Sequence, residues 1–500
     1  MSMGMSMAIS WLLNFQMVLV ITVIFLAVAW LIWVWHPVNL PPGPIGFPIL
    51  GYLPNLGVSI YRTRMQPFRI FAQLSAKYGK VYSLYMGRKL VVIVSSCEAA
   101  REAFKNPRLN DRPMMNAFPQ ACLGVLCGSG KLWQYQRRFT LHQFRQFGIG
   151  KSSFQDKIAE ETTFLLQEFD RNADNPFDPA ADLHNCLSNV LCSVVFGKRF
   201  HYSDDEFRRI ITILEKQFEI AGQGALMLFI SILSHFQPKH IRQTSAQMRD
   251  FISNIVNNHV DTFNNSKLRD YIDVYISELE NSQNNNSSTE QLLISNTSLY
   301  QTVSQLFAAG TETTVTSLRW SLLLMAAYPE IQSRIQREID STVGRNRLPR
   351  LDDHLPLTEA TIMEVQRYAS IVPLGVPHEA AEDTTLLGYN IPKGALILCN
   401  IWAIHHDPEV WPNPEQFRPE RFLDKDGKVD RPQQYVPFSI GNRKCLGEHL
   451  AKMELSVIFS HLLHQFTFKL PEGCDKVNLE SSLGATNVPK PFQIVATKRE

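Results

Sequence analysis

The segment FSIGNRKCLG, which ends at Gly447, leads directly into an apolar run with helical period over residues 450–466. A cysteine at the start of a helix has its thiolate favoured by the helix dipole and by exposed N–H groups, and such a thiolate is a good metal ligand. Gly441 permits a tight turn, Gly447 lets the helix backbone approach a flat partner, and Arg443 places a cation close to the sulfur. A lone cysteine is more commonly a buried apolar residue, but this pattern predicts that Cys445 is a metal ligand.

The composition is that of a large globular chain without a net electrostatic field. Its 500 residues carry 49 Lys and Arg against 47 Asp and Glu, a formal net charge of +2. This balance excludes a general nucleic-acid binder, and the hydrophobic share of 45% excludes a disordered chain. Eight cysteines are too few for a disulfide scaffold of this length, and none forms the C-x-x-C pair typical of zinc sites. We therefore expect reduced thiols in a protein that faces the cytosol.

The N-terminal segment predicts a membrane anchor. Nineteen residues without a charge occupy positions 17–35, which is long enough to cross a bilayer. A cleaved signal peptide is the alternative, because residues 27–29 read Ala-Val-Ala, but the apolar run continues past them and no basic segment precedes it. Seven Lys and Arg lie between positions 62 and 89, before the first acid at Glu98, and they support a cytosolic body.

The sequence divides into three parts. Residues 1–36 form the predicted anchor, and residues 37–61 contain a Pro/Gly-rich hinge, LPPGPIGFPILGYLP, in which five prolines and three glycines prevent a continuous helix. Residues 62–500 show no shift of composition and no internal repeat. We therefore expect this part to be one large domain, mainly α-helical with a minor β-sheet.

Hydrophobic periodicity predicts the main elements of that domain. The sequence VYSLYMGRKLVVIV at residues 81–94 predicts a β-hairpin, and a further short strand signal lies within residues 384–398. The polar run NSQNNNSS at residues 281–288 predicts a loop. Helical period marks four segments besides 450–466, namely residues 158–169, 205–220, 300–328 and 330–339.

A second motif breaks helix propensity in the middle of a long apolar helix. Residues 309–314 read AGTETT, and Gly and Thr are poor residues for a helix interior. Hydroxyls that compete for backbone carbonyls beside a glycine open one turn and leave a groove for a small molecule or water. Functional sites are where such rule-breaking is expected, which makes Glu312 and Thr313 candidate catalytic residues. Taken alone, close helix packing at small residues explains the pattern equally well.

Weaker patterns add charged and aromatic candidates. The chain has an E-x-x-R pair at residues 364–367, a PERF segment at 419–422, a W-x-x-x-R pair at 133–137, an NDR segment at 110–112 and a VPH segment at 376–378. Most side chains in such patterns are solvated or merely satisfied, so none identifies a site by itself.

Together these motifs resemble the cytochrome P-450 family, over nearly the whole chain and in the family's order. The family's haem-binding loop matches at all five of its fixed positions, which here are Phe438, Gly441, Arg443, Cys445 and Gly447. The resemblance implies haem b with Cys445 as the axial thiolate ligand of the iron. It also implies contacts to the haem propionates from Arg443 and from Arg112, Trp133, Arg137 and His378.

The resemblance assigns further roles. Glu312 and Thr313 would deliver protons during oxygen activation, and Glu364 and Arg367 would join Arg421 in a buried ion network. Some apolar residues would face the substrate, although ordinary core positions explain them equally well. These residues are Met114, Met115, Phe118, residues 218–224, Phe307, Ala308, Thr311 and residues 374–376.

The implied activity is that of a microsomal monooxygenase, which inserts one atom of O2 into a lipophilic fatty acid, steroid or xenobiotic. No G-x-G-x-x-G segment follows a predicted strand, so we expect neither nicotinamide nor flavin on this chain. Electrons from NADPH would come through a separate flavoprotein reductase, with cytochrome b5 as a second candidate partner. The expected location is the endoplasmic reticulum membrane, with the catalytic body in the cytosol and without contact to nucleic acid.

A basic face on the cysteine side of the haem would bind the acidic reductase. Its expected residues are Arg138, His142, Arg145, Lys151, Lys444 and Lys452. Two rival functions would also keep Cys445: a haem-thiolate isomerase or dehydratase acting on a peroxide, and a haem sensor without catalysis. The first needs neither Thr313 nor a reductase, and the second tolerates loss of Glu312 and Thr313, so the presence of these residues argues against both.

Overall fold

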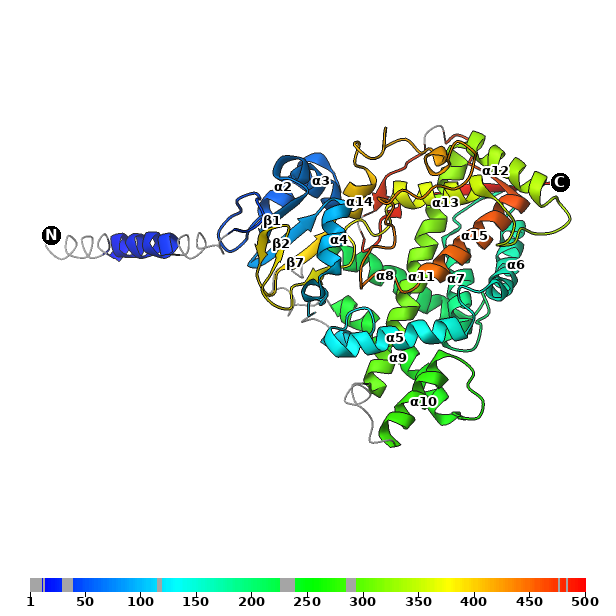
Figure 1. Ribbon diagram of the computed structural model, residues 1–500, viewed down its shortest axis with the longest axis horizontal. Helices are drawn as coiled ribbons and strands as arrows, with labels where there is room; N and C mark the ends of the chain where they lie inside the picture. The colour runs from blue at the N-terminus through cyan, green and yellow to red at the C-terminus, as the bar shows by residue number, and fades with distance from the viewer. Residues whose placement is uncertain are drawn as a thin grey trace.

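The computed structural model describes residues 11, 14–28, 39–114, 119–224, 239–284, 294–474, 477–482 and 484–500. Helices make up most of the described chain, and the strands form small sheets (Figure 1). The longest of the described helices, α11 (Asn296–Ala327), runs through the middle of the molecule with other helices around it. The predicted class, mainly α-helical with a minor β-sheet, is confirmed.

The largest sheet lies at the end of the body nearest the N-terminus and has the strand order β1-β2-β7-β4 (Figure 1). The predicted hairpin forms as an antiparallel pair about Gly87, whose φ of +61° suits the turn. The third strand, β7, comes from far along the chain and pairs parallel to β2. The strands are β1 (Val81–Met86), β2 (Lys89–Val94), β7 (Leu396–Cys399) and β4 (His378–Glu379).

Smaller sheets use short strands that periodicity did not separate. The strand signal at residues 384–398 resolves into the β5–β6 hairpin followed by β7. A three-stranded sheet joins β3, β11 and β8, and β8 starts where the helix predicted over residues 450–466 ends. The strands are β3 (Pro176–Phe177), β5 (Thr384–Leu386), β6 (Tyr389–Ile391), β8 (Phe466–Lys469), β9 (Ser481–Ser482), β10 (Val488–Pro489) and β11 (Ile494–Lys498).

The proline-rich segment packs against the large sheet. The Ser83 N–H donates to the Pro42 carbonyl oxygen (2.8 Å), and the Ser83 hydroxyl donates to the Pro41 carbonyl oxygen (2.7 Å). The helix α2 (Leu53–Thr63) follows, so the last residues of the predicted hinge 37–61 are helical. A proline prevents a helix in the helix interior but is well tolerated in the first turn. The proline in the first turn of α2 therefore does not prevent this helix.

The predicted helices correspond to α6, α8, α11, α12 and α15. All except α8, which begins as predicted, begin earlier than predicted, and α11 and α15 end one residue before the predicted end whereas the others end a few residues later. Ser295 caps α11 by accepting from the Ser298 N–H, which explains its earlier start. The other helices are α3 (Pro67–Tyr78), α4 (Cys97–Lys105), α5 (Gly130–Gln146), α6 (Gln155–Arg171), α7 (Ala180–Val195), α8 (Asp205–Gly224), α9 (Lys239–Asp261), α10 (Tyr271–Asn284), α12 (Pro329–Thr342), α13 (Pro356–Ala369), α14 (Ile401–His405) and α15 (Glu448–Gln465).

The helix α11 continues without interruption through residues 309–314, where the sequence predicts an opened turn. The Thr313 hydroxyl donates to the Ala309 carbonyl oxygen (2.8 Å) and so adds a bond to the helix instead of opening it. A Cβ on Gly310 would lie only 2.9 Å from Cδ2 of Leu191 on α7. The glycine therefore serves close packing of α11 against α7, the alternative that the sequence left open.

The loop predicted at residues 281–288 is wrong for its first four residues, which are helical. The helix α10 continues to Asn284, and the Ser282 hydroxyl donates to the Glu278 carbonyl oxygen (2.7 Å) within it. A run of polar residues does not end a helix when the preceding turns are already packed. Residues 285–288 lie outside the described residues.

The predicted anchor is described only in part. Residues 14–28 are helical, whereas residues 29–38 lie outside the described part of the chain. Among the helices that the structure describes, none combines the length and the apolar character that crossing a membrane requires. The anchor over residues 1–36 stays a prediction.

Candidate functional site

Cys445 lies in the turn that leads into α15. This helix begins at Glu448 with Gly447 as its N-cap, and the Cys445 N–H donates to the Phe438 carbonyl oxygen (2.9 Å). The bond closes the loop and fixes the sulfur at the start of the helix. Cys445 is exposed, so a ligand can reach its sulfur, although the surrounding loop removes part of its hydration.

The surroundings of Cys445 do not by themselves favour its thiolate. Loss of hydration raises the pKa of the thiol, and Glu448 raises it further, whereas the Gly447 N–H, Arg137 and Lys444 lower it. The start of the helix does stabilise the Cys445 thiolate, but loss of hydration and Glu448 outweigh this effect. The expectation from the sequence is therefore not met. A coordinated metal ion deprotonates a thiol outright, so a cation bound here would supply what the protein lacks.

Gly441 lets the cysteine loop lie against the helix α4. Its φ is +79°, and a Cβ would lie 2.4 Å from the carbonyl oxygen of Phe104, so only glycine fits. The ring of Phe104 in turn stacks on His378 with a centroid distance of 4.1 Å. Nδ1 of His378 is 2.9 Å from the Leu109 carbonyl oxygen. The loop, α4 and β4 are thereby held together.

Arg443 lies over the ring of Trp133, with its Cζ atom 3.6 Å from the ring centroid. Its Nε donates to the Asn110 carbonyl oxygen (2.8 Å) and its Nη2 to the Gly128 carbonyl oxygen (2.6 Å). Its Nη1 is buried and has no hydrogen-bond partner. A buried donor of this kind needs an acceptor, and a ligand would provide it.

Arg112 and Arg137 lie in the same cluster. Nη1 of Arg112 donates to the carbonyl oxygens of Val376 and Pro377 (both 2.8 Å), and Nη2 of Arg137 donates to the Lys444 carbonyl oxygen (2.5 Å). Like Arg443, both guanidinium groups bond backbone carbonyls, and within the described ranges none of the three forms an ion pair. Three cations are thus collected without a carboxylate partner.

Burial and repulsion act on this cluster together. Burial and the charge of Arg137 together lower the pKa of Arg112 to about 10. Burial, with repulsion from Arg112 and Arg137, lowers the pKa of Arg443 to about 9, although the Asp111 carboxylate opposes the shift. Burial and the charges of Arg112 and Arg443 hold the pKa of His378 well below its usual value, so this ring is neutral. The cluster would be stabilised by an anion.

The cysteine and the cation cluster fit a haem. Two propionate carboxylates would relieve the repulsion and accept a bond from Nη1 of Arg443. On the cysteine side, apart from neighbouring residues of its own segment, no described atom lies within 4 Å of where a Cβ on Gly447 would be, so a flat group can approach the backbone there. The sequence-predicted residues Cys445, Arg443, Trp133, Arg137, Arg112 and His378 are all brought to this one place.

The predicted catalytic pair on α11 is held by two different elements. Oε2 of buried Glu312 lies 3.1 Å from Nε2 of His184 on α7, and the Thr316 hydroxyl donates to Oε1 (3.4 Å). Thr313 instead bonds the Ala309 carbonyl of its own helix. Glu312 therefore points to α7. Sequence reasoning missed His184, whose one signal is a histidine within an apolar helical run.

A buried carboxyl group ties α11 to α15. The Thr314 hydroxyl donates to Oε2 of Glu454 (3.1 Å), and burial raises the pKa of Glu454 to about 8. Glu454 lies on the helix that starts beside Cys445, and Thr314 follows Thr313. This bond therefore fixes the segment of α11 around Thr313 relative to the cysteine loop, a contact that the sequence did not reveal.

Two of the residues implied to face the substrate belong to the core. Phe307 is fully buried and packs against Phe196 and Phe251, with centroid distances of 5.7 Å and 6.4 Å. Thr311 is also fully buried, and its hydroxyl accepts from Ser188 (3.3 Å). The expectation is therefore wrong for these two, because their side of α11 faces neighbouring helices.

The other substrate candidates are less enclosed or lie beyond the description. Val376 is 41% exposed, Met114 is 69% exposed, and Ala308 is partly buried. The Val376 carbonyl is held by Arg112, so this residue stands next to the cation cluster. Met115 and Phe118 lie outside the described residues, and the side chains of residues 220–224 are not described.

The buried ion network implied by the resemblance is present. Glu364 and Arg367 are fully buried and form two bonds, Nε to Oε2 (2.7 Å) and Nη2 to Oε1 (2.9 Å). Nε of Arg421 donates to Oε1 of the same carboxylate (3.2 Å). Nη1 of Arg367 also donates to the His405 carbonyl oxygen (2.8 Å). The network joins α13 to the segments on either side of residue 410.

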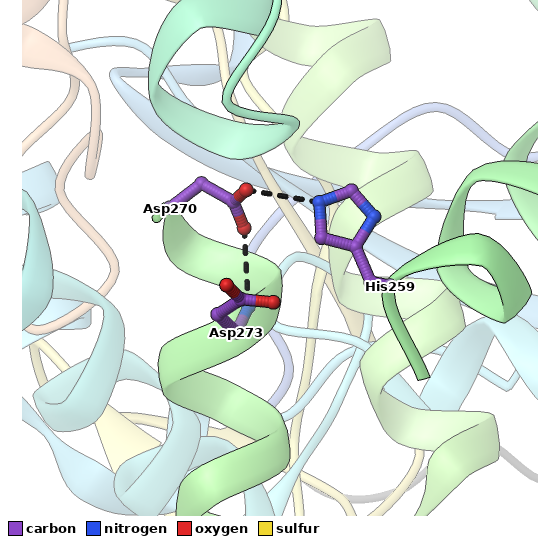
Figure 2. Close-up of side chains that lie close together, drawn as sticks. All are labelled: His259, Asp270 and Asp273. Carbon is purple, nitrogen blue, oxygen red and sulfur yellow. Dashed lines mark hydrogen bonds and ion pairs between the residues drawn. The ribbon is translucent and has the colours of Figure 1, made fainter. Parts of the chain in front are cut away.

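A second cluster lies away from this site, between α9 and α10. Figure 2 shows His259, Asp270 and Asp273, all buried, with Nε2 of His259 2.9 Å from Oδ2 of Asp270. Nδ1 of His259 bonds the Ile255 carbonyl (2.8 Å), and Arg269 binds both oxygens of Asp273 (2.6 and 2.7 Å). Protein groups thus already engage these side chains, and the cluster acts as a structural ion network.

An exposed cysteine at the start of a helix, beside arginines that form no ion pair within the described residues, is the arrangement expected of the class of haem-thiolate proteins. Comparison with known proteins agrees, because the profile of the Cytochrome P450 family matches residues 41–496. The chain belongs to this family, and it is a cytochrome P450 monooxygenase.

Several curated relatives resemble the chain over most of its length. Human cytochrome P450 2U1 is 36% identical, with 92% of this chain and 90% of the relative covered. Mouse cytochrome P450 2J5 is 37% identical, with 93% and 92% covered. Cytochrome P450 18a1 of Drosophila melanogaster is 35% identical, with 92% and 87% covered.

Proposed function

We propose that this chain is a membrane-anchored haem-thiolate monooxygenase that oxidises a lipophilic small molecule with electrons from NADPH through a flavoprotein reductase. The observation that carries the proposal is the cation cluster beside Cys445, whose one buried free donor, Nη1 of Arg443, matches a propionate. When bound, haem supplies the activation of O2, from which one oxygen atom enters the substrate and the other leaves as water.

The residues of the site would have different roles. Cys445 would hold the iron, while Arg112, Trp133, Arg137, His378 and Arg443 would bind and orient the propionates. Phe438, Gly441 and Gly447 shape the loop. Glu312 and Thr313 would hold and pass protons. Val376 and Ala308 would offer an apolar surface to the substrate, which favours a lipophilic compound.

A basic groove supports a protein as the source of electrons. The groove has a volume of about 750 Å³ and is lined in part by Arg137, Arg138, His142, Arg145 and Asn442. It lies next to the cysteine loop, because Arg137 bonds the Lys444 carbonyl. Lys151 is exposed beyond the end of α5, whereas Lys444 and Lys452 both pair with Glu448 (2.7 Å each) and contribute less positive charge. An acidic partner fits this face, and a reductase or cytochrome b5 would be one.

Exposed apolar residues support the membrane part of the proposal. Ile45 is 84% exposed and Tyr61 is 75% exposed, and Phe47, Ile49 and Leu50 are each at least half exposed. Large exposed apolar side chains gathered in one segment of the chain indicate an interaction site. It lies in the segment that follows the predicted anchor, so we infer that it rests on the cytosolic face of the endoplasmic reticulum membrane.

The first experiment is a carbon monoxide difference spectrum of the dithionite-reduced protein, with wild type beside Cys445→Ser. We expect a red-shifted Soret band in wild type that is lost in the variant. An unshifted band in folded wild-type protein would contradict the assignment of Cys445.

Turnover then separates the monooxygenase from its rivals. Product that requires O2, NADPH and a reductase excludes an isomerase or dehydratase and a haem sensor. Conversion of a peroxide without external electrons would favour the isomerase or dehydratase instead, and haem binding without any turnover would favour the sensor.

A further inference from the structure

His184 is the centre of a chain of ionisable groups that leads from α11 toward solvent. Its Nε2 is 3.1 Å from Oε2 of Glu312, and its Nδ1 is 3.0 Å from Oε1 of Glu215 on α8. The side chains of His184 and Glu312 are 1% and 6% exposed, whereas that of Glu215 is 41% exposed. One imidazole therefore connects a buried carboxylate with a carboxylate that water reaches.

The hydrogen bonds of His184 suit a protonated ring. The Ala180 carbonyl oxygen lies 2.9 Å from Nδ1, so this nitrogen donates, and a carboxylate oxygen faces Nε2. Both nitrogens thus have acceptors, which an imidazolium needs. The charged groups that face His184 are Glu312 from α11 and Glu215 from α8. Burial lowers the pKa of His184, but the bond and charge of Glu312 and the charge of Glu215 outweigh it and raise the pKa overall.

No other partner of Glu312 among the described residues holds a proton that it could release near neutral pH. The Thr316 hydroxyl bonds Oε1 of Glu312, and a hydroxyl proton is not acidic enough to be lost. The other surroundings of Glu312 and His184 are buried interfaces between helices. His184 is therefore the group through which Glu312 can be reloaded.

We propose that His184 is the proton donor to Glu312 and that Glu215 holds the proton on the His184 ring from the solvent side. The inference rests on the proposed function, in which Glu312 and Thr313 pass protons on. The Nε2–H bond breaks and an O–H bond forms at Oε2 of Glu312, which leaves a neutral imidazole with its proton on Nδ1. The ring then regains one proton from water, so each transfer uses one solvent proton and no electron.

His184 acts through Glu312 and is therefore a positioning residue of the reaction. It also fixes the Glu312 carboxylate toward α7 until the proton has moved. The neutral imidazole and the protonated carboxyl group no longer attract as ions, so after the transfer only neutral hydrogen bonds to His184 and Thr316 hold the carboxyl group.

The first test measures the ring itself and needs no turnover. Protein labelled with ¹⁵N in its histidine rings is titrated in the haem-loaded full chain, and His184→Asn identifies the His184 resonance. We expect Glu215→Gln to move the His184 titration downward by about one pH unit or more, because it removes a charge at hydrogen-bond distance. The matched control is Glu219→Gln, an exposed carboxylate one turn further along α8, which should leave the titration unchanged.

The second test measures proton delivery with the reductase present. We expect His184→Asn to lower product formed per NADPH about tenfold, with peroxide released instead, because a positioned proton donor is replaced by water. The product formed per NADPH should fall as the pH rises. Glu215→Gln should move this fall to lower pH, while Glu219→Gln should not. Glu215 is partly exposed, so this variant does not depend on tolerance of a change in the core.

The outcomes separate this inference from the proposed function. If wild-type protein forms no product with NADPH and reductase, the proposed function fails, whatever the His184 titration shows. Suppose instead that wild-type protein turns over, and that Glu215→Gln changes neither the His184 titration nor the product formed per NADPH. Then the His184 inference alone is overturned.

Discussion

At the scale of single residues, the cysteine loop depends on one glycine that no other residue can replace. Gly441 combines a φ of +79° with a Cβ position 2.4 Å from a backbone oxygen. Gly427 has a similar φ of +75°, but nothing lies within 4 Å of its Cβ position. The two glycines therefore separate the effect of backbone conformation from that of close contact.

We expect Gly441→Ala to cost more stability than Gly427→Ala. The control should lose only about 1 kcal/mol for the left-handed conformation, whereas Gly441→Ala must also displace α4. Thermal unfolding and the carbon monoxide spectrum measure the two effects. Equal losses for both variants, with an intact spectrum, would show that the contact with Phe104 is not needed.

The sequence identified this loop at the level of residues because its signal is local. The spacing of Gly441, Arg443 and Cys445 is visible without a fold. The partners of these residues are not visible, since Asn110 and Gly128 contribute only carbonyl oxygens and any residue has one. His184 was missed for a related reason, because its importance comes from Glu312, which lies on another helix.

At the scale of elements, α13 is joined to the segment near residue 420 by a buried carboxylate with two arginines. We expect Arg367→Ala to destabilise the protein by about 3–5 kcal/mol, because it leaves Glu364 buried without its main partner. The exposed Arg337 on α12 is the control, and Arg337→Ala should change little. Denaturant unfolding compares the two, and a similar small loss in both would contradict the role of the network.

The junction of α9 and α10 should make stability depend on pH. The bonds of His259 to Asp270 and to the Ile255 carbonyl raise its pKa above the ordinary 6.5, although burial opposes them. The stabilisation that protonated His259 provides is therefore complete below about pH 6.5. It is lost as the pH rises through the higher pKa that His259 has in the folded protein. We expect His259→Gln to be less stable than wild type near pH 6, with a difference that shrinks near pH 9.

Unfolding midpoints of wild type and His259→Gln at several pH values test this dependence. His354→Gln, at an exposed histidine, serves as the control and should show no pH-dependent difference. A difference between His259→Gln and wild type that stays constant with pH would assign the cluster a role in packing alone.

Helices and strands could be predicted where hydrophobic periodicity, or pairing between strands close in sequence, specifies them. The hairpin of β1 and β2 and the helices α6, α12 and α15 follow from their own residues. Pairing of β2 with β7 was not predictable, because about three hundred residues separate the strands and neither signals its partner. In α11 the prediction of an opened turn was wrong, since the small residues serve packing against α7.

At the scale of the whole molecule, charge is balanced overall but not over the groove beside the cysteine loop. We expect the double variant Arg138→Glu/Arg145→Glu to slow reduction by the reductase about tenfold at low salt, without altering the carbon monoxide spectrum. Stopped-flow reduction measures the effect. Reversal of the exposed Lys425 and Lys428 is the control, and equal slowing there would exclude a specific docking face.

The helix α11 crosses the molecule from one side to the other, is capped by Ser295 just before its first residue, and contacts α7, α9, α13 and α15. None of these four helices can separate from the body without disturbing α11. Its central amides should therefore exchange with deuterium at the rate of the most complete opening of the molecule, while those of β9 and β10 exchange through local fraying. A difference in exchange between these segments would locate where the molecule loosens first.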